Sequence, residues 1–237
     1  MNDTTLATYA AAFNLTLTAG QLAQFDQYQA LLLDWNQRLN LTAITDPAAI
    51  QVRHFLDSLT CATITGDLNG RRLVDVGTGA GFPGLPLKIL FPALQLTLVE
   101  SVVKKTRFLE AVVNELRLTG VTILAERAEV LGRRPAHRAQ YDWVLARSVA
   151  ELRVLVEYLL PLCRMGGRAL AQKGENAAVE VEAATLAIAT LGGGRPEITP
   201  IHLPGRAETH YLVVIPKERE TPERYPRRPG MAEKRPL

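Results

Sequence analysis

The sequence predicts an α/β fold, in which a mostly parallel sheet carries helices on both faces and is closed by an antiparallel hairpin. Along residues 66–216, short apolar runs alternate with longer stretches of helical periodicity, which is the pattern of repeated strand–helix units. A glycine-rich loop joins the first apolar run to the helix that follows it. Near the end of this region, two strand-like runs follow one another with no helix between them, so they are expected to pair antiparallel.

Residues 1–65 precede the first predicted strand and have a helical pattern, so they are expected to form a helical cap beside the sheet. Thr18 is a typical N-cap residue, and Asp46 followed by Pro47 combines a cap with a proline at the first helical position. The expected helices are residues 4–17, the stretch from Thr18 to about Asn40, and the stretch from Asp46 to about Cys61.

His54 and Asp57 lie about one turn apart on the third of these helices, so they share a face. Two interpretations are open: a catalytic His–Asp pair, or a hydrogen-bonded pair that fixes the helix against the main domain. The second is favoured.

Residues 66–216 contain the predicted sheet and its connecting helices. The expected parallel strands are 73–76, 94–99, 121–125, 141–146 and 168–171, and the expected hairpin is 198–203 with 211–215. The expected helices begin near Pro83 or Pro86, and then cover 102–117, 150–164 and 177–191. Glycines follow the last three helices and stop them. In such sheets the ligand binds beyond the carboxyl ends of the parallel strands.

The loop after the first strand places Asp75 two residues ahead of a glycine series, Gly77, Gly79 and Gly81. Glycine is needed where the backbone takes a positive φ or where a ligand lies against the main chain. Glu100 ends the second strand about 20 residues later, the spacing at which a carboxylate reaches the ribose hydroxyls of a bound nucleoside. The loop is therefore expected to bind a ligand that contains adenosine.

Asp75 selects between two such ligands. A dinucleotide places a pyrophosphate on this loop, where a carboxylate would repel it. S-adenosylmethionine carries an ammonium and a sulfonium instead, and Asp75 is expected to attract them. The pattern therefore favours a methyl donor over NAD, and an NAD-dependent oxidoreductase is the less favoured alternative. A non-catalytic RNA-binding module would predict a damaged loop, whereas this one is intact.

The fourth strand runs into Ala146-Arg147-Ser148-Val149. It has neither the Asn/Asp-Pro-Pro-Tyr motif used for exocyclic amino groups nor a nucleophilic cysteine. An acceptor with a free lone pair, such as guanine N7, needs no general base, and positioning supplies most of the acceleration. Arg147 is the candidate catalytic residue, with guanine, phosphate or the cofactor as its partner. A 2′-O-ribose methyltransferase is the nearest enzymatic alternative, but it would require a Lys-Asp-Lys-Glu set.

The net charge of +3 is concentrated in residues 217–237, which hold seven Lys and Arg against four Glu. This proline-bearing tail is interpreted as an RNA-binding arm or as a solvated tail, and a tail folded back on the helical cap is the competing possibility. The residues expected to contact RNA are Lys173, Arg224, Tyr225, Arg227 and Arg228.

The chain has only two cysteines, Cys61 and Cys163, which are expected to be packed thiols in a reducing compartment. It has no basic leader and no apolar run near the roughly 20 residues of a membrane span. We expect a cytoplasmic monomer with no metal site and no membrane association. It is expected to have three parts: a cap (1–65), a methyltransferase domain (66–216) and a basic tail (217–237).

The sequence resembles the RsmG family, also called glucose-inhibited division protein B, over nearly the whole chain. The matching segments are 40–44, 54–59, 75–87, Glu100-Ser101 with Lys104-Lys105 and Phe108-Leu109, 127–129, 146–150, Lys173-Gly174 and 224–230. The resemblance implies a class I methyltransferase fold, which is Rossmann-like, with S-adenosylmethionine as cofactor. It implies transfer of a methyl group to N7 of one guanine in the 530 loop of 16S rRNA, with that RNA or the small ribosomal subunit as partner.

The family's cofactor contacts carry over to Gly77, Phe82, Ala128, Glu129 and Arg147 by this resemblance. Glu100 is the expected ribose ligand of the general fold. From position alone, Ala128 is expected along the adenine face and Glu129 near its edge, although a carboxylate at a helix start accounts for Glu129 equally well.

Overall fold

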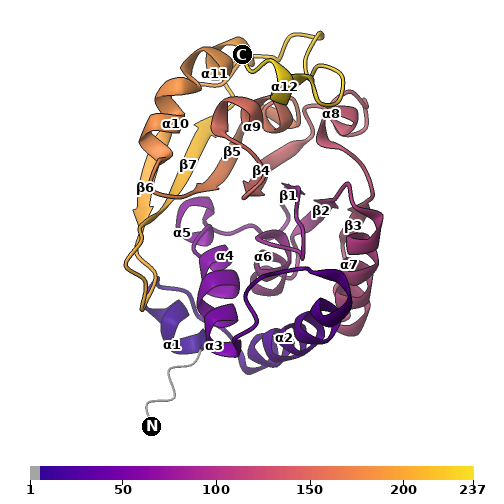
Figure 1. Cartoon of the computed structure of the whole chain (residues 1–237), viewed down its shortest axis with the longest axis vertical. Helices are drawn as coiled ribbons and strands as arrows, with labels where there is room; N and C mark the ends of the chain where they lie inside the picture. Colours follow the sequence, from indigo (N-terminus) through magenta and orange to yellow (C-terminus); the bar gives the residue numbers. More distant parts are fainter. Residues whose placement is uncertain (1–5) are drawn as a thin grey trace.

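The computed structural model describes residues 6–237, in which one sheet has the strand order β3-β2-β1-β4-β5-β7-β6 (Figure 1). The first five strands pair in parallel, while β7 pairs antiparallel with both β5 and β6. The strands are β1 (Arg72–Val76), β2 (Gln95–Val99), β3 (Val121–Leu124), β4 (Tyr141–Arg147), β5 (Cys163–Lys173), β6 (Glu197–Ile201) and β7 (His210–Pro216). The predicted fold class and closing hairpin are confirmed.

Helices cover both faces of the sheet. The N-terminal elements are α1 (Leu6–Ala11), α2 (Ala19–Leu39), α3 (Pro47–Ile50), the π-helix η1 (Gln51–Leu56), α4 (Asp57–Leu59) and α5 (Ala62–Thr65). The others are α6 (Gly84–Leu90), α7 (Val103–Glu115), α8 (Ala128–Leu131), α9 (Leu152–Leu159), α10 (Ala177–Ala183), α11 (Thr185–Thr190) and α12 (Met231–Lys234). None of the helices in residues 6–237 is long and apolar enough to cross a membrane.

The N-terminal helices begin where the cap signals place them. Thr18 and Gln21 form a reciprocal capping box at the start of α2, and Asp46 Oδ2 accepts a hydrogen bond from the Ala49 N–H at 2.7 Å. The third expected helix is unbroken from Pro47 to Leu59, but its middle part, η1, is π-helical and joins α3 to α4. Residues 4 and 5 of the first expected helix lie outside the described residues.

Two apolar clusters fill the two sides of the sheet, because successive side chains of a strand point to opposite faces. Leu73 belongs to a cluster that also holds Tyr28 of α2 and Phe108 of α7. Val74 belongs to the other cluster, with Leu155 of α9. The N-terminal helices thus share one core with the sheet, and a boundary at residue 65 stays a prediction.

Three expected helices differ from their predicted extents. The helix expected over 4–17 ends at Ala11, as α1. The helix expected over 150–164 ends at Leu159, and β5 begins at Cys163, because Cys163 pairs with Tyr141 of β4 across the sheet. Glycine at position 167 allows this pairing, because any other residue would place a Cβ only 2.8 Å from the Tyr141 carbonyl oxygen. The helix expected over 177–191 is divided at Ala184 into α10 and α11.

The C-terminal segment, residues 217–237, is folded onto the α8–α9 side of the sheet (yellow in Figure 1). Tyr225 is buried with 7% of its surface exposed. Arg227 forms an ion pair with Glu157 of α9 at 2.6 Å, and Glu157 has 1% of its side chain exposed. The interpretation as a solvated tail is therefore wrong. The segment contacts α8, α9, α11 and the loop after α8, and its buried residues belong to the apolar cluster on the opposite side of the sheet from the helical cap.

Candidate active site

The glycine loop joins β1 to α6 at the carboxyl edge of the sheet. Gly77 and Gly79 have φ of +68° and +60°, a left-handed backbone conformation that favours glycine. Asp75 Oδ2 accepts hydrogen bonds from the Thr78 hydroxyl at 2.6 Å and from the Gly84 N–H at 2.8 Å. This carboxylate therefore ties the loop to the first turn of α6.

Asp75 itself is fully buried and is not among the residues that line the cavities described below. Burial raises its pKa to about 6, although the hydrogen bonds from Thr78 and Gly84 act in the other direction. Its Oδ1 has no hydrogen-bond partner within residues 6–237. A direct contact between Asp75 and the methionine end of the donor stays a prediction; the role that the structure shows is to order the loop.

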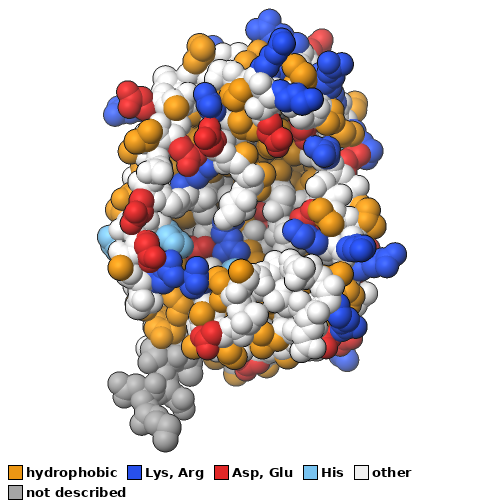
Figure 2. Space-filling view, viewed as in Figure 1, with side chains coloured by type: hydrophobic (Ala, Val, Ile, Leu, Met, Phe, Trp, Pro, Cys, Tyr) orange, Lys and Arg blue, Asp and Glu red, His pale blue; other side chains and the backbone are white. Residues whose placement is uncertain are grey.

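A cavity of about 550 Å³ opens at the carboxyl ends of β1, β2, β4 and β5, next to the point where the strand order reverses. Figure 2 shows a recess on this face, bordered by Lys and Arg side chains. The volume lies within the range of about 300–1,000 Å³ that is usual for small-molecule sites. Residues that line it include Thr42, His54, Phe82, Glu100, Arg147 and Gln172.

A second, smaller hollow of about 120 Å³ lies beside it and shares Gly77 with the larger cavity. Ala128 and Glu129 line this smaller hollow, at the start of α8. Gly230 of the C-terminal segment closes on it, since its N–H donates to Glu129 Oε1 at 2.9 Å. Apart from Asp75 and Gly81, which line neither hollow, the predicted cofactor residues thus line two adjoining hollows that meet at the glycine loop.

Glu100 lies between the loop and α7. Its Oε2 accepts a hydrogen bond from the Gly79 N–H at 3.0 Å, and its Oε1 accepts one from the Val102 N–H at 2.8 Å. Each oxygen keeps a second lone pair, which suits a ribose diol. At Gly79 a Cβ would meet no atom within 4 Å, so glycine there leaves open space against the main chain. These residues fit an adenosine that passes from the smaller hollow into the larger cavity.

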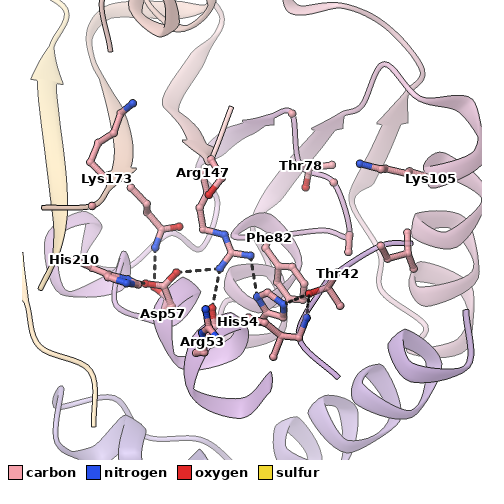
Figure 3. A pocket seen from close by; sticks show the side chains of 18 of the residues that line it. Thr42, Arg53, His54, Asp57, Thr78, Phe82, Lys105, Arg147, Lys173 and His210 are labelled. Carbon is pink, nitrogen blue, oxygen red and sulfur yellow. Dashed lines mark hydrogen bonds and ion pairs between the residues drawn. The ribbon is translucent and has the colours of Figure 1, made fainter. Parts of the chain in front are cut away.

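Arg147, at the end of β4, joins the sheet to the π-helix (Figure 3). Its Nη1 donates to Asp57 Oδ2 at 2.9 Å and to the Arg53 carbonyl oxygen at 3.2 Å, and its Nη2 lies 3.3 Å from His54 Nδ1. The guanidinium also lies over the ring of Phe82, 4.9 Å from the centroid. His54 and Asp57 therefore meet through Arg147, an arrangement that fixes the helix rather than a catalytic pair.

His54 is a neutral wall of the cavity. Burial and the charge of Arg147 lower its pKa to about 4, and its ring stacks on Phe82 with centroids 4.7 Å apart. Because Arg147 can only donate, Nδ1 is the accepting nitrogen and Nε2–H donates to the Thr42 hydroxyl oxygen at 2.7 Å. Both ring nitrogens are thus engaged, so His54 has no nitrogen available as a general base.

Asp57 contacts residues from three strands, β4, β5 and β7. Its Oδ1 lies 3.0 Å from His210 Nδ1 on β7, and its backbone oxygen accepts from Gln172 Nε2 at 2.9 Å. Burial alone would raise the pKa of Asp57, but the hydrogen bond from His210 and the charge of Arg147 outweigh it and lower the pKa. Gln172 and His210 were not predicted, since they lie on different strands and belong to no recognisable motif. Thr42 lies in the matching segment 40–44, but that segment gave no signal of a contact with His54.

The five residues expected to contact RNA are not all placed for it. Lys173 lines the larger cavity, but its ammonium donates to the Ala150 carbonyl oxygen at 2.6 Å and pairs with Glu180 at 2.7 Å. Tyr225 is buried, and the guanidinium groups of Arg224 and Arg227 lie over its ring, so it offers no open face to a base. Arg227 is held by Glu157. Arg224 and Arg228 are exposed, and RNA contacts by them stay a prediction.

Solved structures share the fold. A SAM-dependent O-methyltransferase from Thermotoga maritima aligns with a TM-score of 0.54 at 17% identity, over 81% of this chain and 72% of that chain. TYW2 of M. jannaschii in complex with AdoMet aligns with a TM-score of 0.51 at 16% identity, over 65% of this chain and 70% of that chain. The fold, the glycine loop and the acidic residue after β2 define a class I methyltransferase that uses S-adenosylmethionine.

The sequence comparisons are more specific. The model of the family described as "GidB: rRNA small subunit methyltransferase G" matches residues 21–207. A ribosomal RNA small subunit methyltransferase G from Roseiflexus castenholzii is 55% identical over 96% of this chain and 97% of the relative. One from Desulforamulus reducens is 42% identical over the full length of both. The chain belongs to the rRNA small subunit methyltransferase G (GidB) family.

Proposed function

We propose that this protein transfers a methyl group from S-adenosylmethionine to N7 of one guanine in the 530 loop of 16S rRNA. Family membership supports the rRNA substrate. The observation in the site that carries the proposal is the shape of the larger cavity: it runs from the glycine loop to Arg147 and beyond, and it is lined there by His54, Thr42 and Gln172. There is room for an acceptor base next to the donor.

The methyl transfer requires little from the protein beyond positioning the donor and the acceptor base. When bound, S-adenosylmethionine supplies an electrophilic methyl group, whose carbon forms a bond to N7 while the carbon–sulfur bond breaks and its electron pair stays on sulfur. No proton leaves the acceptor, which agrees with a cavity whose only described imidazole walls, His54 and His210, are engaged with Thr42, Arg147 and Asp57. The protein's contribution is to hold both molecules in line and to exclude water.

Different residues are proposed to hold the cofactor and the acceptor. We propose that Ala128 and Glu129 hold the adenine, that Glu100 holds the ribose, and that Gly77 and Gly79 let the donor lie against the main chain. Arg147 is proposed to act on the acceptor side, because β4 ends there and its guanidinium is already fixed by Asp57 and His54. A fixed donor group stabilises a transition state without reorganising.

We propose that the RNA backbone lies at the mouth of the larger cavity rather than on the C-terminal segment. Arg53 and Lys105 both line the cavity, Arg53 is exposed, and neither takes part in the ion pairs found in residues 6–237. Unpaired cations can neutralise phosphates. The partner is proposed to be 16S rRNA or the small ribosomal subunit, which places the protein in the cytoplasm.

The proposal is tested by incubating the purified protein with tritiated S-adenosylmethionine and either naked 16S rRNA or small subunits. Transfer should occur at one guanine, and the label should be found in N7-methylguanine after digestion. 23S rRNA is the matched control and should remain unlabelled. Label in a ribose methyl or in an exocyclic amino group would overturn the proposal and favour another class of RNA methyltransferase.

A further inference from the structure

Gln172 is a wall residue of the larger cavity that the proposed mechanism does not use. It lies near the end of β5, with 8% of its surface exposed. Its Nε2 donates to the Asp57 carbonyl oxygen at 2.9 Å. Because a carbonyl oxygen only accepts hydrogen bonds, the amide atom that faces Asp57 must be the nitrogen, and the other amide atom is the oxygen, Oε1.

The other end of that amide has nothing to bind. Gln172 Oε1 is a buried oxygen without a hydrogen-bond partner in residues 6–237. Buried acceptors are nearly always satisfied, and an exception calls for an explanation such as a ligand that completes the bond. At the wall of a substrate cavity, an unpaired acceptor is suited to a ligand that brings a donor.

Arg147 stands directly beside it. Arg147 and Gln172 are register partners on the parallel strands β4 and β5, so their side chains lie on the same face about 4.8 Å apart at the backbone. Asp57 anchors both, Arg147 through its carboxylate and Gln172 through its carbonyl. Three N–H groups of the guanidinium are engaged, which leaves two of the five donors free.

Arg147 and Gln172 thus present a hydrogen-bond donor next to a hydrogen-bond acceptor. A purine can bind both only if its own acceptor and donor stand in the matching order. Guanine has O6, an acceptor, beside N1–H, a donor, whereas adenine has N6–H₂ beside an unprotonated N1. When O6 and N1–H form these hydrogen bonds, N7 lies on the other side of O6 and stays free to face the methyl group of S-adenosylmethionine.

Building on the proposed function, we propose that Gln172 determines specificity for guanine: its Oε1 accepts the N1–H of the acceptor base while Arg147 donates to O6.

The test compares acceptor RNAs in which the target guanine is replaced by inosine or by 2,6-diaminopurine. Inosine keeps O6 and N1–H, whereas diaminopurine reverses them and still has N7. The wild-type protein should methylate the inosine RNA with kcat/KM close to that of the guanine RNA. It should reject the diaminopurine RNA by about 100-fold or more, since a polar site left unpaired discriminates strongly.

Gln172→Met then isolates the side chain. It should lower kcat/KM for the guanine RNA by roughly tenfold or more and shrink the preference for inosine over diaminopurine by a similar factor. The intrinsic reactivity of each N7 cancels in that comparison. Gln29→Met is the matched control, because Gln29 on α2 also has an unpaired Oε1 but lines neither hollow; it should leave the preference unchanged.

Two results would overturn the inference. One is a wild-type protein that methylates the diaminopurine RNA as well as the inosine RNA, which is decisive even if the Gln172 variant fails to fold. The other is a folded Gln172→Met protein, with normal melting temperature and S-adenosylhomocysteine affinity, whose preference is undiminished. Failure of the proposed function gives a different result, namely no N7 methylation of the guanine RNA by the wild-type protein.

Discussion

Arg147 is the residue on which most of the site depends. Its guanidinium links β4 to the π-helix through Asp57, Arg53 and His54, and it covers the ring of Phe82. The sequence indicated Arg147 by its place after the fourth strand. The partners that orient it could not be predicted, because they come from segments up to 94 positions away in the chain.

Arg147→Ala should reduce methyl transfer at least tenfold at saturating cofactor and RNA, because the fixed donor beside the acceptor is lost. It should also lower the free energy of unfolding by roughly 3 kcal/mol, since the Asp57 carboxylate, with only 5% of its side chain exposed, loses its charged partner. The matched double variant Arg147→Ala/Asp57→Asn should recover stability without recovering transfer. Recovery of both would assign Arg147 a purely structural role.

The raised pKa of Asp75 predicts how the stability of the protein depends on pH. Its pKa is raised to about 6 by burial, so the stability that the protonated carboxyl contributes is fully present below the unfolded-state pKa. It is lost as the pH rises through about 6. The free energy of unfolding of the wild type, measured relative to Asp75→Asn, should therefore fall by roughly 2 kcal/mol between about pH 4 and pH 7. Urea unfolding across that range checks this; a difference independent of pH would contradict it.

At the scale of elements, the predictions from sequence succeeded where the signal is local. Capping residues located the start of α2, and glycine spacing located the loop between β1 and α6. Prediction failed where tertiary contacts decide. The π-helix is one case, because docking of His54 and Asp57 onto Arg147 gives no local signal. The early start of β5 is another, because it depends on pairing with β4.

The packing of the C-terminal segment against the sheet could not be predicted from sequence for the same reason. Its charge suggested an RNA-binding arm, but much of that charge serves folding: Arg227 pairs with buried Glu157, and Lys217 and Arg219 donate to backbone carbonyl oxygens of Leu191 and Ala189. No composition rule shows that a basic, proline-bearing stretch has an acidic partner 70 residues earlier in the chain.

Truncation after Lys217 should therefore lower the melting temperature and weaken S-adenosylhomocysteine binding. The first effect follows from leaving Glu157 buried without its partner, and the second from losing the Gly230 contact to Glu129 at the smaller hollow. Differential scanning calorimetry and isothermal titration measure the two. Arg224→Gln is the control, since Arg224 is exposed and its removal should change neither. An unchanged melting temperature in the truncated protein would show that the segment is dispensable for folding.

For the molecule as a whole, the α/β pattern predicted the sheet, the ligand edge and the closing hairpin, because each depends on periodicity and chain order. The RNA surface that we propose could not be predicted in this way, since it requires knowing which cations remain unpaired after folding. Arg53 and Lys105 come from the π-helix and α7, far apart in the chain, and both line the larger cavity.

Replacing Arg53 and Lys105 together with Gln should flatten the dependence of log rRNA affinity on log salt concentration. Each lost phosphate contact with a single strand reduces the slope by about 0.7, so the pair should reduce it by about 1.4. Arg224→Gln/Arg228→Gln is the matched pair on the C-terminal segment and should leave the slope unchanged. Filter binding over a salt series decides between them, and the reverse pattern would return RNA binding to the C-terminal segment.

Mass-spectrometric mapping of methylguanine in cells that lack this protein tests whether it methylates N7 of one guanine in the 530 loop of 16S rRNA. We expect one N7-methylguanine to disappear from that loop and to return with the wild-type gene but not with one encoding Arg147→Ala. An unchanged methylation map in the deletion strain, or the loss of a methyl group from a ribose or an exocyclic amine instead, would contradict it.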